Sequence, residues 1–307
     1  MKKELVLAAF GAAVFMTSCS NEHEVFPDNT ERPSVESPVK FSSSINGATP
    51  QTRAGSSTWD AGNTIGIFMV DGTPDIVDYT TNRAYRTSDG SNNFSPVSMS
   101  DNVYYPVNGS TVNFISYYPW QTGISLDNLY NVNVVNQHNS TDIDMLYAKT
   151  TSGYSKGTSG SVVQLFFDHK LTHMVLNITP GAGLSATDLN GMTVTIKGLN
   201  TKTTVDLKDG NLGTPVNVAD IVMKTSSNGS KSDAILVPQS IADGGMRVEF
   251  KINAANGEET FVWKVPATTF ESKKEHVYDV TIARTGISVT GEINPWETGT
   301  GGSGNAD

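Results

Sequence analysis

The chain has 307 residues, with 21 Lys plus Arg against 31 Asp plus Glu and a formal net charge of −10. An acidic chain of this kind lacks the clustered positive charge that binds phosphate backbones, so nucleic acid is excluded as an expected partner. The length allows one large domain or two medium ones. Because Cys19 is the only cysteine, no disulfide can form within the chain.

Residues 1–19 have the pattern of a bacterial lipoprotein signal. Two lysines are followed by an apolar run from Leu5 to Met16 and by small residues directly before Cys19. The run is about 12 residues long, too short to cross a hydrocarbon core of roughly 30 Å as a helix, so we expect a cleaved signal over 1–18. Cys19 then becomes the lipidated first residue of the mature protein. The alternative is a secretory signal followed by a buried free thiol.

Beyond the signal, residues 19–37 are polar, acidic and proline-containing, which predicts a disordered tether. From there on, hydrophobic residues repeat mainly every two positions, which is typical of strands with one buried face. The first such strand is predicted where three apolar residues alternate with polar ones: Val39, Phe41 and Ile45. Further strands are predicted at 65–70, 112–118, 162–167, 174–178, 192–197, 234–237, 247–252 and 276–282.

Clusters of Gly, Asn, Asp and Ser separate these segments and supply turn residues. Many short strands joined by such turns predict an all-β fold built from β-sandwiches. A Gly/Pro cluster at 179–183 suggests a boundary between an N-terminal domain at 38–179 and a C-terminal domain at 180–296. The Gly/Ser-rich tail at 297–307 has too little apolar content to fold.

His169 and His173 are the first candidates for chemistry. On a strand, residues four apart share a face but lie about 13 Å from each other, so chelation of one metal ion would need a bend. No third ligand is indicated by spacing, and no glycine-rich loop has the context of a phosphate site. We therefore interpret both histidines as structural and expect no metal and no cofactor.

Carboxylates and aromatic residues offer two alternative functions. Asp142 and Asp144 form a close acidic pair that could serve a glycosidase, but the chain lacks a Gly-x-Ser-x-Gly elbow and we expect no enzyme. Trp59 and Trp120 lie in aromatic-rich stretches and could stack on sugar rings if exposed. A monomeric surface lipoprotein that binds glycans is thus an alternative function, although packing explains these aromatics more simply.

Several segments, taken together and in order, resemble the fimbrillin family, the subunits of type V pili of Bacteroidota. They are the lipoprotein signal ending at Cys19, Thr52-Arg53 followed by Trp59 to Ile67, the paired Tyr-Tyr-Pro segments, Asp144 to Ala148, Leu165 to Leu171 and Ile293 to Trp296. The resemblance implies two tandem transthyretin-like Greek-key β-sandwich domains. It also implies a non-enzymatic lipoprotein, anchored in the outer membrane and assembled with other pilin subunits into adhesive fimbriae at the cell surface.

The resemblance further implies that a trypsin-like maturation protease cuts between Arg53 and Ala54. The surrounding residues are small and polar, as in loops that proteases reach. The cut would separate the strand containing Phe41 from the rest of the fold. The alternative is that Arg53 is an ordinary solvated loop residue.

Loss of that strand would leave an apolar groove beside unpaired backbone groups, which a strand of another subunit could fill. The best donor is segment 286–296, in which apolar residues recur at even spacing: Ile287, Val289 and Ile293. Such a head-to-tail contact builds a filament when its rotation does not close a ring. The alternative is that 286–296 is the final strand of its own domain.

Overall fold

The computed structural model describes residues 37–46, 58–78, 80–138, 142–158, 161–254 and 257–296. Over these ranges the protein is all-β, with short 3₁₀ turns and no α-helix, which confirms the predicted class. The turns are η1 (Met99–Asp101), η3 (Lys156–Thr158) and η4 (Ala186–Leu189). Within the described ranges, no helix has the length and hydropathy that crossing a membrane requires.

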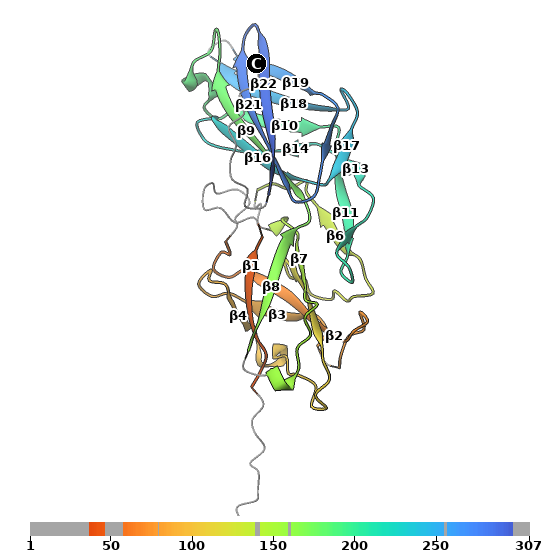
Figure 1. Ribbon diagram of the computed structural model, residues 1–307. Helices are drawn as coiled ribbons and strands as arrows, with labels where there is room; N and C mark the ends of the chain where they lie inside the picture. Colours follow the sequence, from red (N-terminus) through yellow and green to blue (C-terminus); the bar gives the residue numbers. More distant parts are fainter. Residues whose placement is uncertain are drawn as a thin grey trace, which may run out of the picture. The chain divides into compact units, whose positions relative to one another are not determined.

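The first half of the chain forms a closed ring of strands (Figure 1). Its hydrogen-bonded order is β1-β4-β3-β2-β5-β7-β8. The strands of this half are β1 (Lys40–Ile45), β2 (Thr64–Val70), β3 (Arg83–Arg86), β4 (Asn93–Pro96), β5 (Asn113–Tyr118), β6 (Tyr130–Asn133), β7 (Leu146–Lys149) and β8 (Val162–His169). The structure differs here from the expected sandwich of two separate sheets. β1 pairs with both β4 and β8, and it thereby joins these two edge strands and closes the ring.

The second half of the chain is built from several smaller sheets. Its long strands are β9 (Thr172–Pro180), β10 (Thr193–Lys197), β11 (Asn200–Asp206), β16 (Lys231–Leu236), β18 (Met246–Ala254), β19 (Gly257–Val265), β21 (Lys274–Ala283) and β22 (Gly286–Pro295). The short strands are β12 (Asn211–Leu212), β13 (Val216–Val218), β14 (Ile221–Val222), β15 (Lys224–Thr225), β17 (Gln239–Ile241) and β20 (Thr268–Phe270). The sheet that concerns function here has the order β15-β16-β9-β21-β22.

Sheet membership changes between β8 and β9, and therefore earlier than the boundary expected at 179–180. β9 ends at Pro180. It pairs with β16 and β21, which are both strands of the second half. The Gly/Pro cluster at 179–183 thus begins at the end of β9. A further strand of the first half, β6, pairs with β11, and the described residues from Ser37 onward belong to one compact unit.

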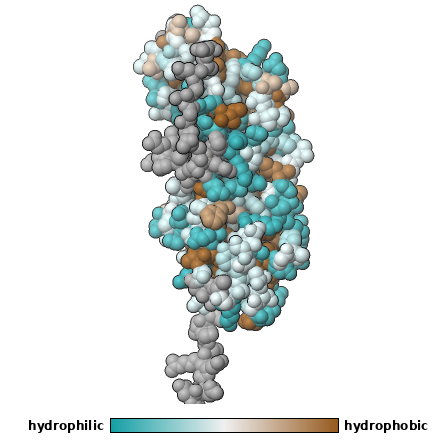
Figure 2. Space-filling view, in the orientation of Figure 1, coloured by the Kyte–Doolittle hydropathy of each residue, from teal (hydrophilic) through white to brown (hydrophobic). Residues whose placement is uncertain are grey.

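Two hydrophobic cores fill the fold. One lies inside the ring and is rich in aromatic rings: Phe41, Trp59, Tyr85, Phe94, Phe114 and Phe167. The other combines the second half with apolar residues of β2, β5 and β6, which explains why the two halves share one unit. On the face shown in Figure 2, hydrophobic residues appear as separate patches among hydrophilic ones.

Candidate functional site: the β1 slot and the Trp296 junction

β1 is buried along its apolar face, as the alternation predicts. Val39, Phe41 and Ile45 are 5%, 2% and 5% exposed. The strand runs parallel to β8, with Phe41 opposite Val163, and antiparallel to β4. Since β1 supplies hydrogen bonds to both neighbours, its removal would open the ring and leave two unpaired strand edges.

Phe41 occupies an aromatic slot. Its ring makes edge contacts with Tyr85, at 5.0 Å between centroids, and with Phe114, at 5.1 Å. The hydroxyl of Tyr85 accepts a hydrogen bond from the backbone N–H of Val103 (3.1 Å), and burial raises the pKa of Tyr85 to about 12, so the slot is uncharged. Burying a phenyl ring of this size contributes about 2–3 kcal/mol. β1 is therefore attached by an anchor that fills a cavity in the ring core.

Ser43 is the small residue on the same buried face. It is 2% exposed, and its hydroxyl has no hydrogen-bond partner among the described residues. An unpaired buried hydroxyl is unfavourable by roughly 1–3 kcal/mol. In β1, Phe41 thus favours attachment of the strand to the ring, whereas the unpaired hydroxyl of Ser43 opposes it.

The end of β1 is held by Asp168. The side-chain amide of Asn46 donates to this carboxylate at 2.7 Å, and the ammonium of Lys273 donates to its other oxygen at 2.6 Å. Burial alone would raise the pKa of Asp168, but the hydrogen bonds from Asn46 and Lys273, together with the lysine charge, lower it. Asp168 therefore stays ionised and joins the end of β1 to the loop before β21.

β22 is the last strand of its sheet and pairs on one side only, with β21. Ile287 and Val289 are half-buried and pack against the second core. Ile293 is 56% exposed, although it lies on the same face of the strand. The structure thus accounts for the first two apolar residues of the expected donor segment within its own sheet, but not for the third.

Trp296 fixes the end of β22. Its indole is 6% exposed and stacks on two imidazoles, at 3.8 Å from His169 and 5.3 Å from His173 between ring centroids. Its backbone N–H donates to the carbonyl of Lys273 at 2.7 Å. Trp296 therefore packs onto the connection between β8 and β9.

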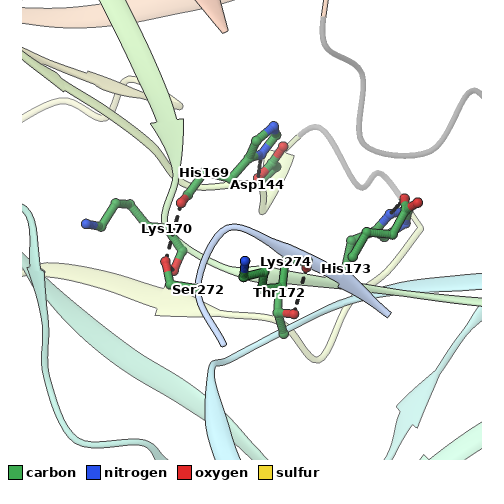
Figure 3. Close-up of polar contacts among 8 residues, drawn as sticks. Asp144, His169, Lys170, Thr172, His173, Ser272 and Lys274 are labelled. Atoms are coloured by element: carbon green, nitrogen blue, oxygen red, sulfur yellow. Dashed lines mark hydrogen bonds and ion pairs between the residues drawn. The ribbon is translucent and has the colours of Figure 1, made fainter. Parts of the chain in front are cut away.

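Each of these histidines has an acidic partner. The Nδ1 of His169 lies 3.0 Å from Asp144, and the two side chains point toward one another in Figure 3. The Nδ1 of His173 lies 2.8 Å from Glu275, while its Nε2 is 3.7 Å from Asp233, an ion-pair distance beyond hydrogen bonding. Among the described residues, no group of three or more His, Cys, Asp or Glu side chains is arranged to hold a metal ion.

Backbone contacts tie the same junction together. The hydroxyl of Ser272 donates to the carbonyl of Lys170 at 2.9 Å, and that of Thr172 donates to the carbonyl of Lys274 at the same distance (Figure 3). Sequence reasoning missed this junction and the Asp168 contacts. The only available signal was the local motif from Phe167 to His173, which says nothing about which distant residues it meets.

Trp59 packs in the interior of the fold, in line with the packing interpretation that is favoured over sugar stacking. Its indole is 4% exposed and lies in the ring core, with edge contacts to Phe94, Tyr118 and Phe167. Trp120 is half-buried against the second core. Trp59 is thus buried because it fills the interior of the ring, which leaves the glycan-binding alternative without one of its two expected rings.

The structure brings together only some of the predicted site residues. Val39, Phe41 and Ile45 share one buried face, and Ile287, Val289 and Ile293 share one strand. Cys19, Arg53 and Ala54 lie outside the described residues. Asp144, one member of the acidic pair considered for catalysis, is engaged by His169.

Comparisons with known proteins identify the family. The chain matches the family model described as fimbrillin-like over residues 52–296. A candidate fimbrium subunit of Bacteroides uniformis, Fim1C, is 31% identical, and the match covers 100% of both chains.

Comparison with solved structures gives similar results. A candidate cell adhesion protein from Bacteroides uniformis has a TM-score of 0.72 at 28% identity, covering 84% of this chain and 98% of that one. A fimbrial protein from Bacteroides vulgatus has a TM-score of 0.53 at 14% identity, covering 84% and 99%, a likeness in fold alone. The family consists of structural proteins, which confirms that the chain is not an enzyme. The chain belongs to the fimbrillin-like family.

Proposed function

We propose that this protein is a structural subunit of cell-surface fimbriae that polymerises by strand exchange and supports adhesion. Family membership supports the fimbrial role, since Fim1C carries that description over the full length of the match. The observation that carries the exchange mechanism is the burial of Phe41 in the aromatic slot formed with Tyr85 and Phe114. A strand with this anchor, placed in the sequence just before the segment that contains Arg53, leaves a defined acceptor groove when it departs.

The acceptor groove would have two means of binding a new strand. The edges of β4 and β8 present backbone groups that β1 had paired, and the slot beside Tyr85 and Phe114 presents apolar surface. Main-chain hydrogen bonds supply affinity in such strand addition, and side-chain pockets supply specificity. β22 of another copy is the proposed donor, because it lies at a sheet edge and exposes Ile293.

The export route belongs to the same proposal. Lipidation at Cys19 would hold the precursor at the outer membrane, and cleavage between Arg53 and Ala54 by a trypsin-like protease would release both the lipid and β1. The partners are then other pilin subunits of the same or a related kind. We also propose that each half of the chain is a variant of the transthyretin-like Greek-key sandwich, joined at the connection between β8 and β9.

The proposal is tested by replacing Arg53. Wild-type filaments sheared from cells are expected to contain subunits that begin at Ala54, whereas Arg53→Ala should leave a lipidated, unpolymerised chain. Arg86→Ala is the matched control, because Arg86 is an exposed arginine of β3 and should leave maturation unchanged. The measurements are N-terminal sequencing and electron microscopy of the surface material. Filaments built from uncut chains that begin at Cys19 would contradict the proposal.

A further inference from the structure

We propose, resting on the function above, that β22 of one copy enters the β1 groove of another in a single register, with Asn294 in the place of Asn46 against Asp168. The residues on one face of β22 follow the same order of large and small side chains as those on the buried face of β1. The corresponding positions are Val39 with Ile287, Phe41 with Val289, Ser43 with Gly291, and Ile45 with Ile293. In both strands an asparagine follows the last isoleucine.

Asp168 is the specificity-determining residue in this arrangement. It holds the amide of Asn46 at 2.7 Å and would lose that partner when β1 leaves. Lys273 remains on its other oxygen, so the carboxylate stays ionised and still needs a donor on the groove side. The amide of Asn294 supplies the same chemistry from the incoming strand, and among the described residues of its own fold it donates to the exposed side chain of Glu292.

Other registers fit the slot worse. A shift of two residues in one direction places Gly291 at the position of Ile45, and a shift in the other direction places Gly291 at the position of Phe41. Either shift leaves a large pocket without a side chain, which is unfavourable because close-packed cores tolerate voids poorly.

A reversed strand is the nearest competitor. It would place Ile293 at the position of Phe41, and Pro295 at the position of Val39. The N–H of Val39 donates to the carbonyl of Val103 at 2.8 Å, and proline has no N–H to replace it. A reversed strand would also present Ser288 to Asp168 in place of an amide.

The exchanged strand changes two contacts of the groove. Gly291 removes the unpaired hydroxyl that Ser43 buries, which favours the incoming strand. Val289 is smaller than Phe41 and leaves part of the aromatic slot unfilled, which opposes it. Gly291 is also required within its own sheet, because a Cβ there would clash with the ring of Tyr278. Ile293, in contrast, is 56% exposed in its own fold and would become buried in the groove of the partner.

Cysteine cross-linking within filaments tests the register. Ser42 lies opposite Gln164 of β8, so Thr290 of the incoming strand should lie opposite Gln164, within reach of a disulfide. Chains carrying Gln164→Cys with Thr290→Cys are expected to give covalent ladders on non-reducing gels. Pairing Gln164→Cys with Ser288→Cys should give none. Cys19 is removed with the lipid in the mature chain, so it does not interfere.

The outcomes separate the two proposals. A ladder from Gln164→Cys with Glu292→Cys would show either a reversed strand or the shift that places Gly291 at the position of Phe41, and a ladder with Ser288→Cys would show the opposite shift; each of these overturns the register. Filaments that form without any cross-link overturn the assignment of β22 as donor. Failure of the wild-type chain to form filaments would contradict the proposed function itself.

A double-mutant cycle tests the contact with Asp168. Asn294→Ala and Asp168→Ala are each expected to speed filament dissociation in denaturant about tenfold, as is usual for losing a hydrogen bond to a charged group. The combined variant should add little to either single change, because both remove the same contact. Fully additive effects would show that the two residues do not meet between copies.

Discussion

His173 has a protonation state that depends on the charges around it. Burial alone would lower its pKa, but Asp233 and Glu275, which face its two nitrogens, outweigh burial and raise it. The charge of Lys231 helps to lower the pKa of Glu275, and the ring of Trp296 stacks on the imidazole of His173. A raised pKa means that the folded protein binds the proton more tightly than the unfolded chain does. The stabilisation that protonated His173 gives to the folded state is therefore complete below about pH 6.5. It is lost as the pH rises through the pKa of His173 in the folded protein.

We expect the free energy of unfolding to fall as the pH rises above about 6.5, with a slope from this group of at most about 1.4 kcal/mol per pH unit. His173→Gln should flatten that part of the profile, measured by urea denaturation at a series of pH values. His276 is the matched control: burial lowers its pKa, so its titration destabilises the fold below about 6.5 and not above it. An unchanged profile in His173→Gln above that pH would show that the imidazole does not hold its proton as described.

β1 shows how far the sequence pattern goes and where it stops. The alternation at 39–45 is sufficient to predict which side chains are buried, because a strand with one apolar face must bury it. It cannot predict the partner strand, since the pairing of Phe41 with Val163 joins distant parts of the chain. For the same reason the sequence does not predict the stacking of Trp296 on His169. β21 pairs in parallel with β9, which is far from it in sequence, and β22 pairs with β21, so that the end of β22 lies near the connection between β8 and β9.

Phe41→Ala is expected to destabilise the full-length chain by about 3–5 kcal/mol, the usual effect of truncating a buried aromatic ring. Lys40→Ala, at the neighbouring exposed position of β1, should change the stability by no more than about 0.5 kcal/mol. Both are measured by denaturant unfolding of the uncut protein. Equal effects of the two substitutions would mean that β1 does not cover the slot, and the exchange mechanism would lose its acceptor.

Considered as a whole, the molecule brings the ends of its two exchange strands to one junction. Asn46 at the end of β1 contacts Asp168, Asp168 contacts Lys273, and the carbonyl of Lys273 accepts the N–H of Trp296 at the end of β22. The connection between β8 and β9 lies beside this path, since Asp168 is in β8. Contiguous contacts of this kind allow a change at one strand end to alter the other, provided that both ends depend on the shared residue.

Asp168→Ala tests that dependence in the uncut chain. Hydrogen exchange is expected to accelerate at two backbone amides: that of Asn46, which donates to the carbonyl of Phe167, and that of Trp296. Glu249→Ala is the matched control, because Glu249 is likewise an ion-paired carboxylate, held by Arg247 and Lys197, but lies on β18 away from this path. Faster exchange at Asn46 alone would mean that the two strand ends respond independently. Faster exchange at both would mean that Asp168, through its contacts with Asn46 and Lys273, holds the two strand ends at one junction.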